Sequence, residues 1–195
     1  MNDEPAYRPP SADAILADTK AIGFTMASEP KTGSLLRTLA ATKPAGQLLE
    51  LGTGTGYATA WLLDGMDNAS ELTSVDFEGR FQRIAQKHLG EDRRVRFVHA
   101  DAEEYLSGTE SGRFDLVFAD TWAGKFTHLN EAVALLKPGG LYVIDDMLPQ
   151  PSWPDEHAKT ITRLLQELSA RTDVLSTRLN WATGIILAVK TKSTS

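Results

Sequence analysis

The chain has 195 residues, of which 42% are hydrophobic and 24% are charged, and its formal net charge is −6. This length favours one domain with a sizeable core, and the acidic balance provides no basic surface for nucleic acid. The absence of cysteine excludes disulfides, thiolate metal sites and cysteine nucleophiles. The polar, proline-rich start has no signal-peptide core, and no run approaches the roughly 18 apolar residues that span a membrane. We therefore expect a cytoplasmic protein without nucleic-acid or membrane partners.

The first 43 residues are predicted to form a helical segment. Residues 1–10 should be a loose arm, because Pro9 and Pro10 disfavour helix. A helix is expected at 11–20, with Ser11 as its N-cap, and a second one at 32–41.

Residues 44–190 are predicted to form the core of a single domain, 1–195. Strands are expected at 47–51, 71–76, 94–99, 114–119 and 140–145, and helices near 57–65, 79–89, 102–107 and 126–136. This alternation is typical of parallel βαβ units with helices on both faces of the sheet.

The last part of the chain breaks this alternation. A helix at about 156–170 is followed by strand-like runs at 174–179 and 184–189. The residues between the two runs are too few for a crossover helix, so the runs should pair as an antiparallel hairpin. The predicted fold class is therefore α/β, with a doubly wound, Rossmann-like sheet of seven strands. This sheet should be mostly parallel, with one antiparallel strand near the edge.

The stretch 47–57 reads Gln-Leu-Leu-Glu-Leu-Gly-Thr-Gly-Thr-Gly-Tyr and joins a predicted strand to a predicted helix. Glycine tolerates positive φ and lets a backbone approach a ligand closely, and a helix N-terminus offers free N–H groups to an anion. A strand, a glycine turn and a helix together form the arrangement that binds nucleotide-type cofactors. The stretch therefore predicts a cofactor of this type.

Five predicted strands end on carboxylates, namely Glu50, Asp76, Asp101, Asp120 and the pair Asp145 and Asp146. Ligands of open α/β sheets bind outside the carboxyl ends of the strands, so these acids should meet at one cleft. The alternative is that each acid only caps the helix that follows it. That alternative suits Asp76 and Asp101 taken singly, and it suits Glu50 and the doubled aspartates less well.

The glycine pattern alone does not choose the cofactor. An acid at the position of Asp76 also suits a dinucleotide enzyme, where it holds the ribose hydroxyls. However, the glycines follow Gly-x-Gly-x-Gly rather than Gly-x-Gly-x-x-Gly, and Glu50 places a negative charge where a pyrophosphate would sit. S-adenosylmethionine fits better, because it carries an ammonium and a sulfonium. An NAD-dependent oxidoreductase is the less favoured alternative.

As a set, the motifs resemble those of the class I S-adenosylmethionine-dependent methyltransferases, and most closely the small O-methyltransferases related to catechol and caffeoyl-CoA O-methyltransferases. The resemblance covers about residues 22–190 and rests on the segments 49–57, 74–76, 100–102, 114–122 and 136–146 and on the closing hairpin. Thr32 and Gly33 also look like the Thr-Gly pair that this family carries ahead of its first strand.

The resemblance implies which residues contact the cofactor: Glu50, Gly52, Thr53, Gly54, Tyr57, Asp76, Phe77, Asp101, Ala102, Asp120 and Trp122. Glu50 would lie near the amino group, directly or through water, and Asp76 would accept hydrogen bonds from both ribose hydroxyls. Phe77 would pack on the adenine, and Trp122 matches a family tryptophan near the site of methyl transfer. Ordinary core packing is the alternative for Phe77 and Trp122.

The resemblance also implies a metal site. Related enzymes hold a divalent cation with an acid after the fourth strand and an acidic pair after the fifth, which correspond here to Asp120, Asp145 and Asp146. Three carboxylates suit Mg²⁺ or another hard divalent cation, which would bind two neighbouring substrate hydroxyls and lower the pKa of one of them. The alternative is that Asp146 caps a turn and Asp120 only faces the cleft.

The sequence contains more than one candidate for the catalytic base. The catechol-type enzymes have a lysine base three residues after the first metal acid, where this chain has Ala123, and the nearest lysine is Lys125. Asp120 and Lys125 are the catalytic candidates, although surface solvation is the more frequent fate of a lysine. His128 competes with Lys125 because both are predicted on the same helical face. At Ala58, many relatives have a serine that contacts the cofactor.

Together these features predict a methyltransferase that uses S-adenosylmethionine for the metal-assisted O-methylation of a small aromatic hydroxyl acceptor. The alternative is a metal-independent N- or O-methyltransferase for another acceptor. A homodimer through the N-terminal helices is expected from the relatives. The segment 147–154, with three prolines and a tryptophan, should form a wall or lid over the acceptor, or else a simple connector.

Overall fold

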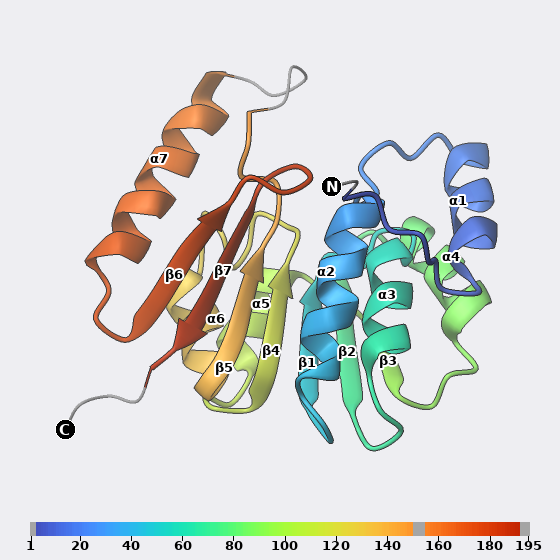
Figure 1. Ribbon diagram of the computed structural model, residues 1–195, viewed down its shortest axis with the longest axis horizontal. Helices are drawn as coiled ribbons and strands as arrows, with labels where there is room; N and C mark the ends of the chain where they lie inside the picture. Colours follow the sequence, from blue (N-terminus) through green and yellow to red (C-terminus); the bar gives the residue numbers. More distant parts are fainter. Residues whose placement is uncertain (1–2, 150–154, 192–195) are drawn as a thin grey trace.

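The computed structural model describes residues 3–149 and 155–191 of the chain. Its strands are β1 (Gln47–Leu51), β2 (Glu71–Asp76), β3 (Val95–His99), β4 (Phe114–Ala119), β5 (Leu136–Ile144), β6 (Val174–Leu179) and β7 (Ile185–Lys190). Its helices are α1 (Ala12–Ala21), α2 (Pro30–Ala41), α3 (Tyr57–Gly65), α4 (Gly79–Leu89), α5 (Ala102–Gly108), α6 (Leu129–Leu135) and α7 (Asp155–Ala170). Figure 1 shows these helices arranged around one central sheet.

The seven strands form one sheet in the order β3-β2-β1-β4-β5-β7-β6. Strand β1 pairs in parallel with β2 and β4, so the sheet extends from its centre in both directions. Strand β7 pairs antiparallel with both β5 and β6, and it is therefore the reversed strand next to the edge. The predicted fold class, a doubly wound and mostly parallel sheet with one antiparallel strand near the edge, is confirmed.

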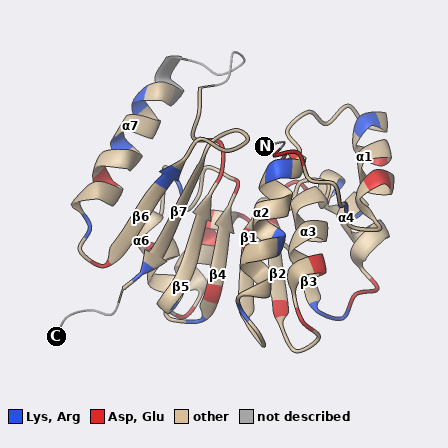
Figure 2. Cartoon of the chain, in the orientation of Figure 1, with Lys and Arg blue, Asp and Glu red and all other residues tan. Residues whose placement is uncertain are grey.

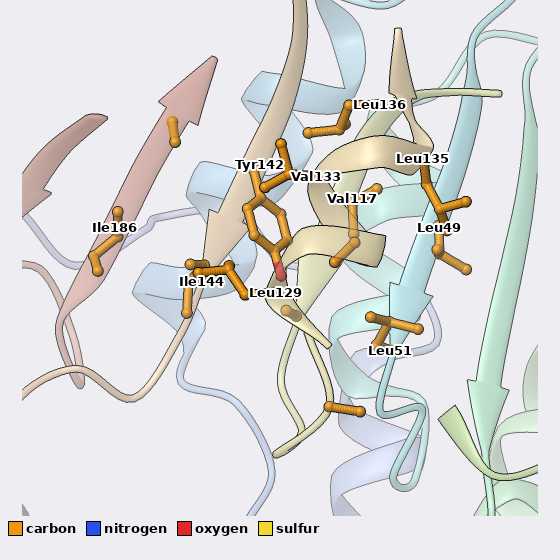
Figure 3. Close-up of a cluster of buried hydrophobic side chains, with 14 of the residues drawn as sticks. Leu49, Leu51, Val117, Leu129, Val133, Leu135, Leu136, Tyr142, Ile144 and Ile186 are labelled. Carbon is orange, nitrogen blue, oxygen red and sulfur yellow. The ribbon is translucent and has the colours of Figure 1, made fainter. Parts of the chain in front are cut away.

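Alternating residues of the central strands supply two hydrophobic layers, one on each face of the sheet. Leu48 packs with residues of α1, α2 and α3, whereas its neighbour Leu49 packs with residues of α5, α6 and α7. This alternation follows from the two-residue repeat of a strand, and it needs apolar side chains on both faces because helices cover both. Figure 3 shows the second layer, in which Leu49, Val117 and Tyr142 lie among side chains of α6.

Two elements begin three or more residues away from their predicted starts. Strand β5 begins at Leu136 instead of 140, and its pairing with β4 changes register between Phe114 and Leu116. Gly139, with φ +82°, lies in this irregular part of the strand. Helix α6 begins at Leu129 instead of 126, because the preceding residues form a turn in which Gly124 N donates to Thr127 O at 2.8 Å.

The described part of the N-terminal arm is docked and not loose. The Tyr7 hydroxyl donates to Asp64 Oδ1 at 2.7 Å, and the Tyr7 ring lies edge-on to Trp61 and beneath the guanidinium of Arg37. Ser11 stands at the N-cap of α1 but makes no capping hydrogen bond with its side chain. The arm therefore gains its order from contacts with α2 and α3, which no local pattern indicates.

Of the predicted proline-rich wall, residues 150–154 lie outside the described residues. Lys and Arg are spread over α1, α2, α7 and the β6–β7 hairpin in Figure 2 and do not gather on one element. Within the ranges 3–149 and 155–191, no helix combines the length and the apolar character needed to cross a bilayer.

Candidate functional site

A cavity of about 720 Å³ opens at the carboxyl ends of the strands. It is lined by the α1–α2 loop, by the segments that follow β1, β2, β4 and β5, and by Thr183 in the β6–β7 turn. Strands β1 and β4 are neighbours at the centre of the sheet although other elements separate them in sequence, so the strand order changes direction beneath this cavity. This is the position where open α/β sheets bind their ligands.

The glycine turn forms the floor of the cavity. Gly52, Gly54 and Gly56 have φ values of +98°, +52° and +91°, which side chains with a Cβ rarely adopt. A Cβ at Gly52 would lie 2.8 Å from Asp120 O and 2.7 Å from Thr121 Cγ2, so this glycine allows the turn to touch the segment after β4. Thr53 and Tyr57 also line the cavity, as predicted for cofactor-binding residues.

Asp76 is fixed to the glycine turn by backbone hydrogen bonds. Its Oδ2 accepts from Gly54 N and its Oδ1 accepts from Glu78 N, both at 2.7 Å, and the side chain lines the cavity. The following Phe77 is 71% exposed at the cavity wall, so the core-packing alternative is wrong for this residue. An acid oriented by two amides next to an exposed ring provides acceptors for hydroxyl groups and a surface for a flat heterocycle.

Two aromatic residues from outside the glycine turn complete this side of the cavity. The rings of Phe24, from the α1–α2 loop, and Phe81, from α4, lie 4.4 Å apart, and both line the cavity. Phe81 belongs to a strongly amphipathic helix, and in sequence it reads as an ordinary core position. Phe24 belongs to the α1–α2 loop and lines the cavity while its ring packs against Phe81 of α4.

Glu50 lies beneath the glycine turn and is fully buried. Its Oε2 accepts hydrogen bonds from the hydroxyls of Ser74 (2.5 Å) and Thr59 (2.6 Å), while Oε1 receives none from any described residue. Burial raises the pKa of Glu50 to about 8, and the two hydroxyls oppose that rise. Glu50 is not among the described residues that line the cavity. It therefore lies deeper than a residue in direct contact with the amino group of a cofactor would.

Asp101 and Ala102 do not line the cavity within the described part of the chain. Asp101 is the N-cap of α5, where its Oδ1 accepts from Glu103 N at 2.7 Å and from Glu104 N at 3.3 Å. The capping alternative therefore describes Asp101, and Ala102 is simply the first residue of that helix. The structure does not place these two residues with the other predicted cofactor contacts.

Asp120, Asp145 and Asp146 form one acid cluster, in which one carboxylate oxygen from each lies within 4.8 Å of the others. Burial, and then repulsion between the carboxylates, raises the pKa of both Asp120 and Asp145, while the Lys125 ammonium opposes the rise at each. Asp146 has φ +62°, a left-handed conformation that non-glycine residues rarely adopt outside functional sites and turns.

Two hydroxyl groups that belong to no recognised motif hold this cluster. The Ser28 hydroxyl, from the α1–α2 loop, donates to Asp120 Oδ2 at 3.2 Å. The Thr183 hydroxyl donates to Asp145 Oδ1 at 2.7 Å, and Asp146 N donates to the same oxygen at 2.8 Å. Both hydroxyls come from segments far from the aspartates in sequence, so only the folded chain brings them together.

Trp122 lines the cavity next to Asp120, and its side chain is half exposed, so core packing does not describe it either. Its ring meets that of Phe126 edge-on, with centroids 4.7 Å apart. Ala58, the position where many relatives have a serine, also lines the cavity. It offers no hydroxyl to a ligand.

The two candidates for the catalytic base, Lys125 and His128, do not line the described cavity. Lys125 is only 4% exposed, and its Nζ donates to Asp145 O at 2.9 Å and lies 3.6 Å from Asp120 Oδ1. His128 is the N-cap of α6, with Nδ1 3.7 Å from Glu103 Oε1, and it is not on a shared helical face with Lys125 as predicted. Neither residue belongs to the described cavity lining.

Residues 49–147, just over half of the chain, match the family model of the methyltransferase domain. A protein from Mycolicibacterium vanbaalenii with the name "Putative O-methyltransferase" is 36% identical over 142 residues, which cover 69% of this chain and 63% of that relative. The chain thus spans less than two thirds of the length of this relative.

Solved structures share the fold at lower identity. The O-methyltransferase from Bacillus cereus, in complex with S-adenosylhomocysteine, is 21% identical with a TM-score of 0.82 and covers 96% of this chain and 94% of its own. An O-methyltransferase from Streptomyces achromogenes involved in tomaymycin synthesis, in complex with S-adenosylmethionine, is 24% identical with a TM-score of 0.80, over 95% and 92%. The chain belongs to the methyltransferase domain family.

Proposed function

We propose that this protein transfers the methyl group of S-adenosylmethionine to a hydroxyl oxygen of a small aromatic acceptor, with a divalent cation at the acid cluster. The observation that carries the proposal is one cavity lined by the glycine turn, by Asp76 and by the three clustered aspartates. A nucleotide-type cofactor and an acceptor can therefore meet in the same space. Positioning of the two reactants supplies much of the rate in such a displacement.

The residues of the cavity fit S-adenosylmethionine, which supplies a methyl group on a positively charged sulfur. Asp76 has the geometry to accept the ribose hydroxyls, and Phe77 offers an exposed ring for the adenine. The unpaired, buried Oε1 of Glu50 is an acceptor that suits the cofactor ammonium, reached through the turn or through a water. Gly52 and Gly54 leave the backbone open to the methionine part.

The acid cluster fits a hard divalent cation such as Mg²⁺. Carboxylate oxygens are the ligands that such cations prefer, and three of them converge here. Asp120, Asp145 and Asp146 would hold the cation, whose charge would lower the pKa of a coordinated substrate hydroxyl. Trp122 would form one wall of the acceptor site next to the cluster, since it lines the cavity together with Asp120.

A metal-independent transfer is the second candidate, and one observation favours it. The buried ammonium of Lys125 already lies against two of the aspartates and offsets part of their charge. In that case Asp120, which lines the cavity, is the group in reach of an acceptor proton. The acceptor class is the same, but neighbouring hydroxyls are no longer required.

The test of the cofactor assignment is calorimetric titration with S-adenosylhomocysteine. Asp76→Ala is expected to weaken its binding about 100-fold, because hydrogen bonds to a charged group contribute about 1.5–3 kcal/mol each. Asp101→Ala is the matched control, since this aspartate caps α5 and does not line the cavity. It should keep the affinity and lose about 1 kcal/mol of stability. Near-native affinity in Asp76→Ala would remove the assignment.

The metal is tested by titrating Mg²⁺ into protein saturated with S-adenosylhomocysteine, with and without a catechol. Binding near one equivalent that is lost in the double variant Asp145→Asn/Asp146→Asn is the expected result. Methyl transfer at an undiminished rate in excess chelator would instead establish the metal-independent candidate.

A further inference from the structure

We propose that Lys125 is a built-in counter-ion of the acid cluster, and that its fixed ammonium lowers the affinity of this cluster for divalent cations. The proposal rests on the proposed function and deepens it, because it describes how this chain regulates its own metal site. Lys125 is then a positioning residue, and it does not take the acceptor proton.

The ammonium of Lys125 contacts the cluster from the protein side. Its Nζ donates to the main-chain oxygen of Asp145 at 2.9 Å and lies 3.6 Å from Asp120 Oδ1. The residue is only 4% exposed, and the described cavity lining does not include it. Asp120 thus lines the cavity while its lysine partner is buried outside the described lining, where water cannot screen the ion pair well.

The backbone around Lys125 holds the ammonium in this place. The Tyr142 hydroxyl donates to Gly124 O, and Gly124 N donates to Thr127 O at 2.8 Å. Gly124 has φ +83°, and a Cβ there would lie 2.9 Å from the Tyr142 oxygen and 3.0 Å from Leu51 Cδ1. The turn is thus packed closely against β1 and β5, and the side chain of the adjacent Lys125 extends to Asp145 and Asp120.

The charges of the cluster and of Lys125 explain why the ammonium would weaken the binding of a divalent cation. Three ionised carboxylates carry a formal charge of −3, and the adjacent ammonium reduces it to −2. A divalent cation that binds between the carboxylates must share their field with the ammonium and is repelled by it. A lysine that serves as a base needs a free lone pair directed at the substrate. The Lys125 ammonium instead donates to a carbonyl and faces a carboxylate.

The test compares Ca²⁺ binding by calorimetry in protein saturated with S-adenosylhomocysteine. Lys125→Met keeps the length of the side chain and removes its charge, and Lys125→Gln is a second neutral variant. The matched control is Lys137→Met, which removes a lysine paired with Asp115 at 2.6 Å at the opposite end of β4. We expect about tenfold tighter Ca²⁺ binding in the two Lys125 variants and an unchanged affinity in the control.

Each outcome bears on the proposal. Ca²⁺ affinity within twofold of the unaltered protein in Lys125→Met and Lys125→Gln overturns it, as does the absence of binding in all proteins. Binding that appears only in the Lys125 variants supports it. If both variants misfold, the ¹⁵N resonance of the Lys125 ammonium is followed in the unaltered protein, where a shift on adding Ca²⁺ supports the proposal and no shift overturns it. Failure of the unaltered protein to bind S-adenosylhomocysteine contradicts the proposed function separately.

Discussion

At the scale of single residues, Glu50 shows how burial and hydrogen bonding oppose each other beneath the cofactor turn. Removal from water is the largest influence and raises its pKa to about 8, whereas hydrogen bonds from Ser74 and Thr59 act to lower it. The carboxyl is therefore mostly protonated at neutral pH in the cofactor-free protein. A cationic cofactor group next to it would favour its ionised form.

This pKa makes the stability of the cofactor-free protein depend on pH. The unfolded chain releases the Glu50 proton near the ordinary value of 4.5, and the folded chain releases it near 8, so the folded state binds one more proton between these values. Stability should then fall as pH rises through this window, by up to about 1.4 kcal/mol per pH unit. The free energy of unfolding is measured in urea at pH 5.5 and pH 7.5. In Glu50→Gln it should not show the fall that Glu50 causes between these two pH values.

The matched control for that measurement is Glu71→Gln, which changes an exposed residue at the start of β2. It should keep the pH dependence of the unaltered protein. An identical slope in Glu50→Gln and in the unaltered protein would show that Glu50 is not responsible.

At the scale of elements, two glycines with positive φ allow backbone strain to be separated from close packing. Gly52 has φ +98° and touches the segment after β4, while Gly139 has φ +82° and has nothing within 4 Å of an added Cβ. Gly139→Ala should cost only the strain of the left-handed region, about 1–2 kcal/mol, and keep S-adenosylhomocysteine binding. Gly52→Ala should cost more and should lose the binding, because it displaces the backbone of Asp120. Urea unfolding and calorimetry measure the two effects, and equal losses in both variants would contradict this distinction.

Much of this architecture could be predicted from local patterns. Three patterns depend on residues that are close in sequence, namely the glycine turn, the alternation of strands and helices, and the acids at the strand ends. They correctly indicated the edge of the sheet at which the cavity opens. The early start of β5 and the late start of α6 were missed because they depend on Gly139 and on the turn at Gly124. Gly124 is explained by its close contacts with Tyr142 and Leu51, and Gly139 by its positive φ alone.

The site itself was predicted in part. Asp76, Phe77, Trp122 and the acid cluster line the cavity, whereas Asp101 and Ala102 belong to the start of α5. An acid at the end of a strand can either cap the next helix or face the ligand, and the sequence does not distinguish the two. Side chains that reach the site from distant loops, such as Ser28 and Thr183, could not be found by any motif spacing.

At the scale of the whole molecule, the start of α2 is joined to the last hairpin. The Trp181 indole donates from Nε1 to Lys31 O at 2.9 Å, and the Lys31 ammonium lies 5.9 Å from the centre of the Trp181 ring. The same ammonium pairs with Asp3 at 3.0 Å. The N-terminal arm and the β6–β7 turn are thereby held together, and Thr183 of the same turn donates to Asp145 of the acid cluster.

The strength of this connection can be measured with Trp181→Phe. The variant keeps an aromatic ring and loses the indole donor, so the free energy of unfolding in urea should fall by about 1 kcal/mol. Leu175→Ala in β6 is the control, since that side chain is 69% exposed and its loss should change stability by less than about 0.5 kcal/mol. Equal values for the two variants would mean that the indole hydrogen bond contributes nothing.

The expectations of a homodimer and of a cytoplasmic location stay predictions. Light scattering of the purified chain measures the first, and fractionation of the producing cell measures the second.

The place of β7 between β5 and β6 has a consequence for synthesis on the ribosome. Strand β6 pairs only with β7 among the described strands, and β7 is the last strand to emerge. Until residue 190 has left the exit tunnel, β6 has no neighbour and β5 keeps an open edge that invites pairing with other chains. The Thr183 contact to Asp145 also waits for this step. The acid cluster is therefore completed only after β7 has emerged, so a nascent chain cannot acquire a finished site before this sheet is closed.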